Sequence, residues 1–382
     1  MSAGSRHLRL LHLHSSFSPG GKELRAAKLM NAFGRGIDHT IISAEPGAYG
    51  AASAVDRAIS VTFPDDFPPL QGRPFPRRLQ ALAKAMRGHD LVLTYNWGAM
   101  DAVMAHTLFG KAFTLPPLVH HEDGFNEDEA QRLKPARNWY RRIALAQAQG
   151  LIVPSQRLEA IALHDWQQPR RMVHRIANGV PVFTYGGKVR PDALPRLTKR
   201  PGELWLGTLA GLRAVKNLPR MVRAFAGLPE PWQLVILGEG PQRADIRAEA
   251  DRLGVIDRVH LPGFAADPAR ALGLFDLFAL SSDSEQFPIS VVEAMAAGLA
   301  VASPRVGDVA AMVAAPNVPY LSDPSDDAGL ANAIARLAAD PAARKTIGAA
   351  NRARAETEYD EAAMVAAYAR VYAGAMGRRQ FP

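Results

Sequence analysis

Short apolar segments alternate with helical segments along almost the whole 382-residue chain. The apolar segments of the first half predict strands over residues 8–14, 39–43, 90–95, 115–121, 151–154 and 172–176. Those of the second half predict strands over residues 204–209, 233–237, 259–261, 274–280, 300–302 and 318–321. Helical patterns fall between most of them, for example over residues 24–33, 218–225, 243–253 and 330–337. This alternation is typical of parallel sheets covered by helices on both faces, and so of an α/β fold.

Two such runs, in a chain longer than one ordinary core, predict two doubly wound domains. A segment rich in glycine, proline and basic residues, 182–202, is the predicted linker. The first domain is therefore expected over residues 1–182 and the second over 183–360. Ligands of open parallel sheets bind beyond the carboxyl ends of the strands. Two such domains facing one another would place a site in the cleft between them.

Composition excludes several classes of protein. The chain is 48% apolar and 21% charged, as in folded soluble proteins. It has no cysteine, which excludes disulfides, thiolate zinc sites and cysteine nucleophiles. No signal peptide is recognisable, and no apolar stretch approaches the roughly 20 residues of a membrane-spanning helix. A cytoplasmic location is the expectation.

The net charge of +8 is concentrated in the first domain. Residues 1–182 hold 22 Lys and Arg against 15 Asp and Glu, whereas the remainder holds 23 against 22. Two stretches, 73–88 and 131–147, mix basic with apolar and aromatic residues, which suits an anionic membrane surface such as the inner face of the plasma membrane. Solvated helix faces explain them equally well. No recognition module for nucleic acid is present, so no nucleic-acid partner is expected.

The segment SEQFPISVVEAMAAGLAV, residues 284–301, holds two carboxylates eight positions apart. Pro288 suits the first turn of a helix that Gly298 would end, so Glu285 is expected in the preceding loop and Glu293 one turn inside. The first three amides of such a helix, those of Ile289, Ser290 and Val291, attract anions. The two carboxylates could bind sugar hydroxyls, and the helix start beside them could bind phosphate. Together they suggest a site for a nucleotide-sugar.

Other loops that follow predicted strands carry glycines, cations or histidines. Gly20 and Gly21 follow the first strand, and Gly238 and Gly240 follow a later one; either pair would let a ligand approach the backbone. Gly211, Arg213 and Lys216 precede a helix expected to start near Asn217, where cations could hold a diphosphate. His120 and His121 precede Glu122 and Asp123, and strand alternation sends the two rings to opposite faces.

Each loop also has a plainer interpretation. A glycine pair is most often a strand-to-helix turn, a basic loop is most often solvated, and either histidine could be a buried structural residue. A metal site at His120 and His121 is disfavoured, because adjacent side chains on a strand diverge. The pattern G-x-G-x-x-G is absent, which counts against a nicotinamide or flavin enzyme.

These residues resemble the retaining glycosyltransferases of family 4, which have the GT-B fold. The resemblance spans nearly the whole chain and is strongest over residues 207–308, in GTLAGLRAVKNL, LVILGEGP, DRVHLPGF and the segment with Glu285 and Glu293. VPS at 153–155, NGV at 178–180 and SPGGKE at 18–23 match landmarks of the acceptor half. The resemblance implies a last helix, within 361–382, that returns to the first domain.

The resemblance also implies roles. Glu285 would contact hydroxyls of the transferred sugar, and Glu293 would hold the ribose. Lys216 and the amides around Phe287, Pro288, Ile289 and Ser290 would stabilise the diphosphate. A histidine after the fourth strand would contact the donor sugar, with His121 preferred to His120, and the base would lie near Gly263 in residues 262–264. Retention without a metal or other cofactor is expected, with same-face attack on the sugar.

Two departures from the family pattern bear on activity. Gly211 stands where an arginine is common, so that Arg213 would have to reach the phosphate instead, and Gln286 stands where glycine is common. The expected acceptor is a glycan or lipid-linked molecule of cell-envelope polysaccharide or glycolipid synthesis. The alternatives are a nucleotide-sugar epimerase of the same architecture, an impaired binding or assembly homologue, and a glycoside hydrolase, which would not need the phosphate loops.

Overall fold

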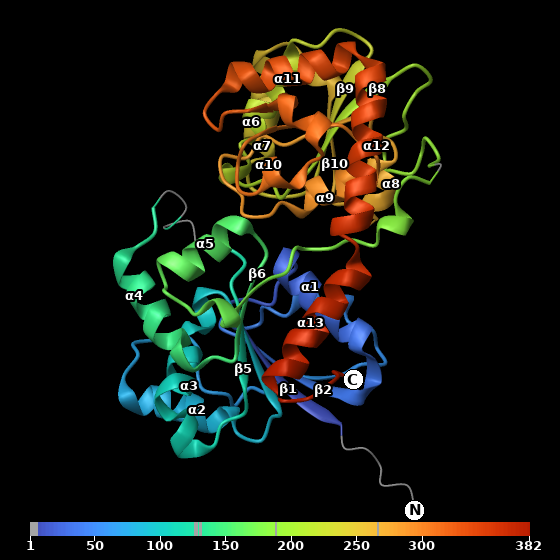
Figure 1. Cartoon of the computed structure of the whole chain (residues 1–382). Coiled ribbons are helices and arrows are strands. Elements are labelled where there is room, and N and C mark those ends of the chain that lie inside the picture. The colour runs from blue at the N-terminus through green and yellow to red at the C-terminus, as the bar shows by residue number, and fades with distance from the viewer. Residues whose placement is uncertain (1–6, 126–128, 130–131, 188, 266) are drawn as a thin grey trace, which may run out of the picture. The chain divides into compact units, whose positions relative to one another are not determined.

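The computed structural model describes residues 7–125, 129, 132–187, 189–265 and 267–382 (Figure 1). Contacts divide the chain into two compact units. Unit 1 comprises residues 1–176 together with 365–382, and unit 2 comprises residues 177–364. The sequence predicted the second domain over residues 183–360, a range that begins and ends a few residues inside unit 2.

Unit 1 contains a seven-stranded sheet in the order β3-β2-β1-β4-β5-β6-β7, and every pair in it is parallel. The strands are β1 (Leu8–His14), β2 (Ile37–Ser43), β3 (Ser60–Thr62), β4 (Leu91–Tyr95), β5 (Leu118–His121), β6 (Gly150–Val153) and β7 (Val173–Arg175). The longer helices of the unit are α1 (Gly21–Phe33), α2 (Pro76–Met86), α3 (Met100–Phe113), α4 (Pro135–Ala144), α5 (Gln156–His164) and, from residue 365 onward, α13 (Glu361–Ala375).

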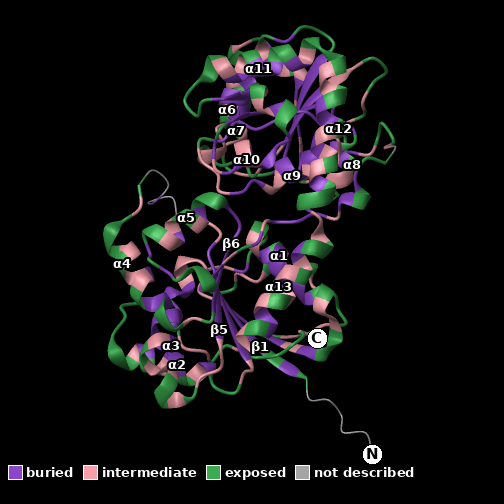
Figure 2. Cartoon of the chain, viewed as in Figure 1, coloured by how far each residue is buried: buried purple, intermediate pink, exposed green. Residues whose placement is uncertain are grey.

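The central strands of unit 1 are buried on both faces, which explains their continuous apolar sequence (Figure 2). Helix starts follow local chemistry. Pro76 and Pro135 occupy the first turns of α2 and α4, and the Ser155 hydroxyl accepts from the Leu158 amide to cap α5. The sequence missed β3, because this short edge strand is largely exposed and carries no apolar alternation.

Unit 2 contains a six-stranded sheet in the order β10-β9-β8-β11-β12-β13, and all its pairs are parallel. The strands are β8 (Leu204–Leu209), β9 (Trp232–Leu237), β10 (Val259–Gly263), β11 (Leu277–Ala279), β12 (Val301–Pro304) and β13 (Leu321–Ser322). Its helices are α6 (Leu218–Ala226), α7 (Arg243–Arg252), α8 (Pro268–Leu272), α9 (Ile289–Ala296), α10 (Val309–Met312), α11 (Asp327–Ala339) and α12 (Pro341–Glu358).

The predicted strand over 274–280 is shorter in the structure, for a local reason. The amides of Leu274 and Phe275 bond the carbonyls of Ala271 and Leu272, so the first apolar residues close the turn after α8. The Phe275 ring then packs on β8, where a Cβ on Gly207 would lie 2.0 Å from it. Gly207 is therefore explained by packing within the sheet.

Helix α13, at the carboxyl end of the chain, packs in unit 1. Figure 1 shows it beside α1, although more than 300 residues separate the two in sequence. The Arg25 guanidinium of α1 lies over the Tyr368 ring at 5.6 Å, and Phe33 contacts Tyr372 edge-on. The expected return of the last helix to the first domain is thus confirmed. In the part of the chain that the structure describes, none of the helices combines the length and apolar character that a membrane span requires.

Candidate functional site

The strand order reverses beside the first strand of each sheet. In unit 1, β1 lies between β2 and β4; in unit 2, β8 lies between β9 and β11. Loops at such a reversal leave the sheet in opposite directions, which opens a crevice at the carboxyl edge where ligands bind. In unit 2, this position belongs to residues 210–217 after β8 and residues 280–288 after β11. These two loops hold Lys216 and Glu285.

Hydrogen bonds join the two loops of unit 2. The Asp283 amide donates to the Val215 carbonyl, and the Asn217 side-chain amide donates to the Asp283 carboxylate, each at 2.9 Å. The Ser281 hydroxyl donates to the Lys216 carbonyl, also at 2.9 Å. Asn217 has a left-handed backbone (φ 43°) and precedes α6 directly, as the sequence predicted within one residue. The backbone that carries Lys216 is therefore fixed against the backbone that carries Glu285.

Lys216 and Glu285 form an ion pair at this edge. Lys216 Nζ lies 2.5 Å from Glu285 Oε1, and the Ser282 hydroxyl donates to the same oxygen at 2.7 Å. The side chains remain 17% and 11% exposed, so solvent or a ligand can reach them. The lysine has three N–H donors, and the second carboxylate oxygen is not part of these bonds. The pair can therefore hold an anion and a hydroxyl group side by side.

Helix α9 begins immediately after this pair. Pro288 is its N-cap residue and adopts an extended backbone, where the sequence predicted the first turn. The Val291 amide donates to the Pro288 carbonyl at 3.0 Å, so the amides available at this end are fewer than the three that the sequence suggested. Those of Ile289 and Ser290 have no intrahelical acceptor at a helix start. A helix start of this kind favours negative charge.

The loop before α9 packs against the segment that follows β12. Gly307 has a left-handed backbone (φ 54°), and a Cβ there would lie 2.7 Å from the Glu285 carbonyl and 2.5 Å from the Gln286 carbonyl. The Asp308 amide donates to the Gln286 carbonyl at 3.1 Å. Phe287 is buried and meets the Tyr359 ring edge-on. The Phe287 side chain thus anchors the loop in the core, and the Gln286 carbonyl holds it by accepting the bond from Asp308.

Glu293 lies on the second turn of α9 and is partly buried. The buried Tyr185 hydroxyl donates to Glu293 Oε1 at 3.3 Å. Burial, and then the charge of Glu293, raises the pKa of Tyr185, so this hydroxyl keeps its proton at ordinary pH. Sequence reasoning missed both Tyr185 and Ser282, because neither belongs to a spacing pattern.

The glycines after β9 and β10 are explained by contacts inside the protein. A Cβ on Gly238 would lie 1.9 Å from the Ala210 carbonyl oxygen, and a Cβ on Gly240 would lie 2.5 Å from that of Leu212. A Cβ on Gly263 would lie 2.8 Å from the Glu239 carboxylate. All three glycines have positive φ angles (146°, 155° and 102°), which residues with a side chain rarely adopt. Gly238 and Gly240 bring backbone against the β8 loop, and Gly263 leaves room for the Glu239 side chain. Contact of any of the three with a ligand remains a prediction.

Gly211 is exposed and has room for a side chain. The nearest atom to a Cβ there is Nε of Arg213, at the ordinary contact distance of 3.6 Å. The exposed Arg213 side chain therefore folds back over the position where the family pattern has an arginine. A guanidinium group is therefore carried close to Gly211, although the arginine stands two residues later in sequence. Contact of Arg213 with a phosphate remains a prediction.

The carboxyl edge of unit 1 is closed by aromatic rings. His121 is 1% exposed; one of its ring nitrogens bonds the Thr94 carbonyl at 3.0 Å and the other bonds the Tyr372 hydroxyl at 2.9 Å. His120 is fully buried on the opposite face, as alternation predicted, and bonds the Thr94 hydroxyl at 2.8 Å. A sugar contact by His121 would require one of these bonds to open. That role remains a prediction.

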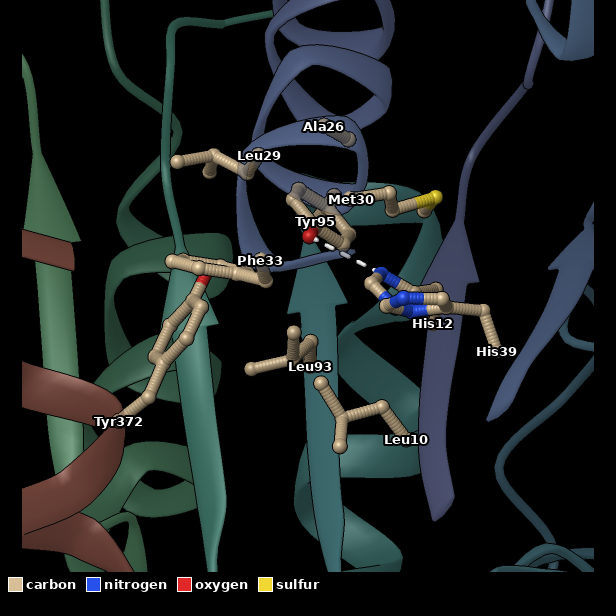
Figure 3. A pocket seen from close by; sticks show the side chains of 10 residues that line it. All are labelled: Leu10, His12, Ala26, Leu29, Met30, Phe33, His39, Leu93, Tyr95 and Tyr372. Atoms are coloured by element: carbon tan, nitrogen blue, oxygen red, sulfur yellow. Dashed lines mark hydrogen bonds between the residues drawn. The ribbon is translucent and has the colours of Figure 1, made fainter. Parts of the chain in front are cut away.

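A small cavity lies beneath this edge, between β1, β2, β4, α1 and α13 (Figure 3). His12 faces it and bonds both the Tyr95 hydroxyl at 3.2 Å and a ring nitrogen of His39 at 2.9 Å. Burial lowers the pKa of His12 and of His14 well below the usual value, and lowers that of His39 to about 4. These rings are therefore neutral packing groups at neutral pH. The cavity is small and is lined mainly by buried side chains of the core of the unit.

Gly20 and Gly21 begin α1 in unit 1. Gly20 is the N-cap residue, and a Cβ there would lie 2.7 Å from the Glu23 carboxylate, which folds back over the helix start and pairs with Lys22. One turn on, Arg25 makes a buried two-bond ion pair with Asp123 of the β5 loop, at 2.5 and 2.8 Å. The Glu23 carboxylate thus lies close to the helix start, and a donor contact at Gly20 or Gly21 remains a prediction.

Two family models match the chain in the same order as the units. The model described as Glycosyltransferase Family 4 matches residues 19–182, and the model described as Glycosyl transferases group 1 matches residues 190–354. The second match contains Lys216, Glu285 and Glu293, whereas Tyr185 lies just before it.

Curated relatives match about half of the chain. N-acetyl-alpha-D-glucosaminyl L-malate synthase of Bacillus anthracis is 24% identical over 211 residues, which are 55% of either chain. The lipopolysaccharide core biosynthesis glycosyltransferase LpsD of Rhizobium meliloti is 29% identical over 182 residues, 46% of this chain and 53% of the relative. The chain thus spans about half the length of these relatives.

Solved structures match nearly the whole fold. The Anabaena protein HepE in complex with UDP has a TM-score of 0.78 at 22% identity, covering 96% of this chain and 100% of that one. Sucrose-phosphate synthase from Thermosynechococcus elongatus has a TM-score of 0.74 at 22% identity, covering 97% and 99%. The fold is GT-B, as the sequence predicted.

Proposed function

The chain belongs to the glycosyltransferases of family 4, and on that premise we propose that it transfers a sugar from a nucleotide-diphospho-sugar to an acceptor hydroxyl. HepE, a structural neighbour, was solved with UDP and with UDP-glucose, which supports a nucleotide-sugar donor here. The observation that carries the proposal is the Lys216–Glu285 pair beside the start of α9, at the strand reversal of unit 2.

The chemistry of the transfer fits these groups. Breaking the bond between sugar C1 and the phosphate oxygen develops positive charge on the sugar and negative charge on the diphosphate. Glu285 would bind sugar hydroxyls through its second oxygen, while Lys216, Arg213 and the amides of Ile289 and Ser290 would hold the diphosphate. Glu293 would accept hydrogen bonds from the ribose. Each group would thus bind or stabilise a different part of the donor: the sugar, the diphosphate or the ribose.

We further propose that the transfer retains the anomeric configuration and needs no metal ion. The acceptor oxygen would bond C1 on the face that the phosphate leaves, and its proton would pass to the departing phosphate oxygen. The cations and amides of the site supply the positive charge that a metal would otherwise provide. Undiminished turnover in EDTA, with a product of unchanged anomeric configuration by NMR, is the expected result.

A cell-envelope glycan or lipid-linked molecule is the proposed acceptor. LpsD acts in lipopolysaccharide core biosynthesis by its name, which supports an acceptor of this class. Helix α4 exposes Trp139 and Ile143, one turn apart, at 61% and 50%, and the Arg142 guanidinium lies 5.0 Å from the centre of the Trp139 ring. An apolar stripe beside cations is suited to an anionic lipid surface. We therefore propose that unit 1 also docks on an anionic membrane surface through α4.

The test of donor and reaction is a panel of nucleotide-sugars with calorimetry and a nucleotide-release assay, run with and without lipid-linked acceptors. Release that requires both one donor and an acceptor is the expected result. Turnover of the donor without an acceptor, with the sugar epimerised, would identify the epimerase alternative instead. Binding of a donor without turnover under every condition would favour an impaired homologue.

Docking is tested with vesicles that contain anionic lipid at low salt. The wild-type protein is expected to cosediment, and the double variant Trp139→Ala, Ile143→Ala to lose most of that binding. Phe183→Ala is the matched control, because Phe183 is 84% exposed but lies in unit 2. A wild-type protein that stays in the supernatant would exclude the docking proposal.

A further inference from the structure

Tyr185 approaches Glu293 from a segment that precedes the sheet of unit 2. The residue follows the short 3-10 turn Val182–Thr184 and is 6% exposed, and its hydroxyl donates to Glu293 Oε1 at 3.3 Å. Its ring belongs to the apolar core that also contains Val291 and Met295 of α9. The hydroxyl is therefore the polar end of an otherwise packed side chain, and it meets the carboxylate at the edge of the core.

Arg352 of α12 fixes this segment against α9. Its Nη1 atom donates to the Tyr185 carbonyl at 2.8 Å and to the Ala296 carbonyl, at the last residue of α9, at 2.6 Å. Gly186 has a left-handed backbone (φ 81°), and a Cβ there would lie 2.3 Å from the same nitrogen. One guanidinium thus ties the backbone of Tyr185 to the helix that carries Glu293, and a glycine makes room for it.

We propose that Tyr185 is a positioning residue that orients the Glu293 carboxylate for the two ribose hydroxyls of the nucleotide. This inference rests on the proposed function, which assigns the ribose to Glu293. The bond occupies one lone pair of Oε1 and fixes the plane of the carboxylate. A ligand would then meet the carboxylate in a set orientation.

The physical reason lies in the flexibility of glutamate. A glutamate on a helix has three side-chain torsions, and ordering them on binding opposes affinity. The ribose presents neighbouring hydroxyls, which one carboxylate can bind together only when its plane matches theirs. A tyrosine held by the core and by Arg352 supplies that orientation before the nucleotide arrives. The effect should therefore appear in the recognition of ribose and not in the recognition of base or phosphate.

The experiment compares a nucleoside diphosphate with its 2′-deoxy analogue by calorimetry, using the nucleotide that wild type binds best in the donor panel. Tyr185→Phe keeps the ring and removes the hydroxyl. It is expected to weaken binding of the ribonucleotide roughly two- to tenfold, the effect of one hydrogen bond, and to weaken the 2′-deoxy form less. The Kd of the 2′-deoxy form divided by the Kd of the ribonucleotide should therefore be smaller in Tyr185→Phe than in wild type.

Two further variants make the test specific. Glu293→Gln should abolish most of the discrimination, and adding Tyr185→Phe to it should change nothing more, because Tyr185 acts through Glu293. Tyr320→Phe is the matched control, because Tyr320 also lies in unit 2 but its ring contacts Arg336 of α11. It should behave as wild type.

The outcomes separate this inference from the proposed function. An unchanged ratio in Tyr185→Phe, while Glu293→Gln loses discrimination, overturns the inference alone. An equal weakening of both nucleotides by Tyr185→Phe also overturns it, since that result indicates a general effect on the fold of the unit. A wild-type protein that binds no nucleoside diphosphate overturns the proposed function and this inference with it.

Discussion

The two units share a doubly wound parallel sheet with the same reversal of strand order, yet their carboxyl edges differ. In unit 1 the edge is filled by stacked neutral rings: Tyr95 lies 3.9 Å from His14 and 4.5 Å from His121, between ring centres. In unit 2 the corresponding edge carries Lys216 and Glu285, charged and partly exposed. His260 is the one histidine of unit 2, whereas the other ten lie in unit 1.

The difference shows that topology alone does not make a site. Helix α13 adds Tyr368 and Tyr372 to the rings of unit 1, and the Tyr372 hydroxyl occupies a nitrogen of His121. Unit 2 instead fixes its charged pair by bonds between two loops and leaves the groups partly open to solvent. The same edge thus serves packing in one unit and is available for binding in the other.

The largest effect on stability is expected from the buried ion pair of unit 1. Arg25→Ala would leave the Asp123 carboxylate buried without its main partner, and breaking such a pair costs about 3–5 kcal/mol. The matched variant Lys216→Met in unit 2 should cost far less stability and much more activity. Urea denaturation with pulsed hydrogen exchange, which reports each unit separately, is the measurement. Equal destabilisation by the two variants would erase the contrast between the edges.

Glu285→Gln should reduce turnover about 10²–10³-fold, because it removes the negative charge that faces the developing positive charge of the sugar. Nucleotide affinity should change much less, since Glu293 and the start of α9 are intact. Single-turnover kinetics and calorimetry with the best donor separate the two quantities. Turnover equal to that of wild type would count heavily against the assignment of the donor site.

The stability of unit 1 should fall as the pH drops from 6.5 toward 4. Burial lowers the pKa of His39 to about 4 and that of His121 to about 3, so these rings stay neutral when folded but take up protons when unfolded. The unfolded state then binds more protons, and acidification favours it by up to about 1.4 kcal/mol per pH unit for each histidine.

The pulsed-exchange measurement between pH 6.5 and 5.5 checks this dependence, because most carboxylates remain ionised there. The strands of unit 1 should lose protection at lower urea as the pH falls, while those of unit 2 should change less. A stability of unit 1 that does not depend on pH in this range would show that the histidines are protonated in the folded state or accessible to water.

The smallest effect is expected at Gly211. Gly211→Arg should be tolerated within about 0.5 kcal/mol, because the position is exposed and has space for a side chain. It should raise kcat/KM less than about threefold, since Arg213 already places a guanidinium there. Arg213→Ala should lower kcat/KM about tenfold, the effect of a charge-assisted bond, and Gly211→Arg should restore it. A failure to restore would mean that the two positions are not equivalent.

Much of the fold could be predicted from the sequence, because buried parallel strands and amphipathic helices carry distinct patterns. β1 and β8 match their predicted ranges, and the loop and helix of Glu285 and Glu293 lie as the spacing indicated. The Lys216–Glu285 pair joins residues 69 positions apart, and Tyr185 and Glu293 are 108 apart. Such contacts depend on the folded chain, and no periodicity in the sequence reveals them.

The histidines show the same limit from the other side. Alternation placed His120 and His121 on opposite faces of β5, but it could not show that Tyr372 of a distant helix would occupy His121. Glycines were similarly ambiguous. Gly238 and Gly240 were expected to allow close approach by a ligand, which remains a prediction, and the structure adds that the backbone of the β8 loop lies against both glycines.

Hydrogen–deuterium exchange with and without a saturating nucleoside diphosphate tests most directly that the donor site lies at the edge of unit 2. Peptides covering residues 210–217 and 283–291 should gain protection, because the nucleotide would contact Lys216, Glu285 and the first amides of α9. Peptides covering β5 and α13 in unit 1 should not change. Protection confined to unit 1, with none over 283–291, would contradict the account.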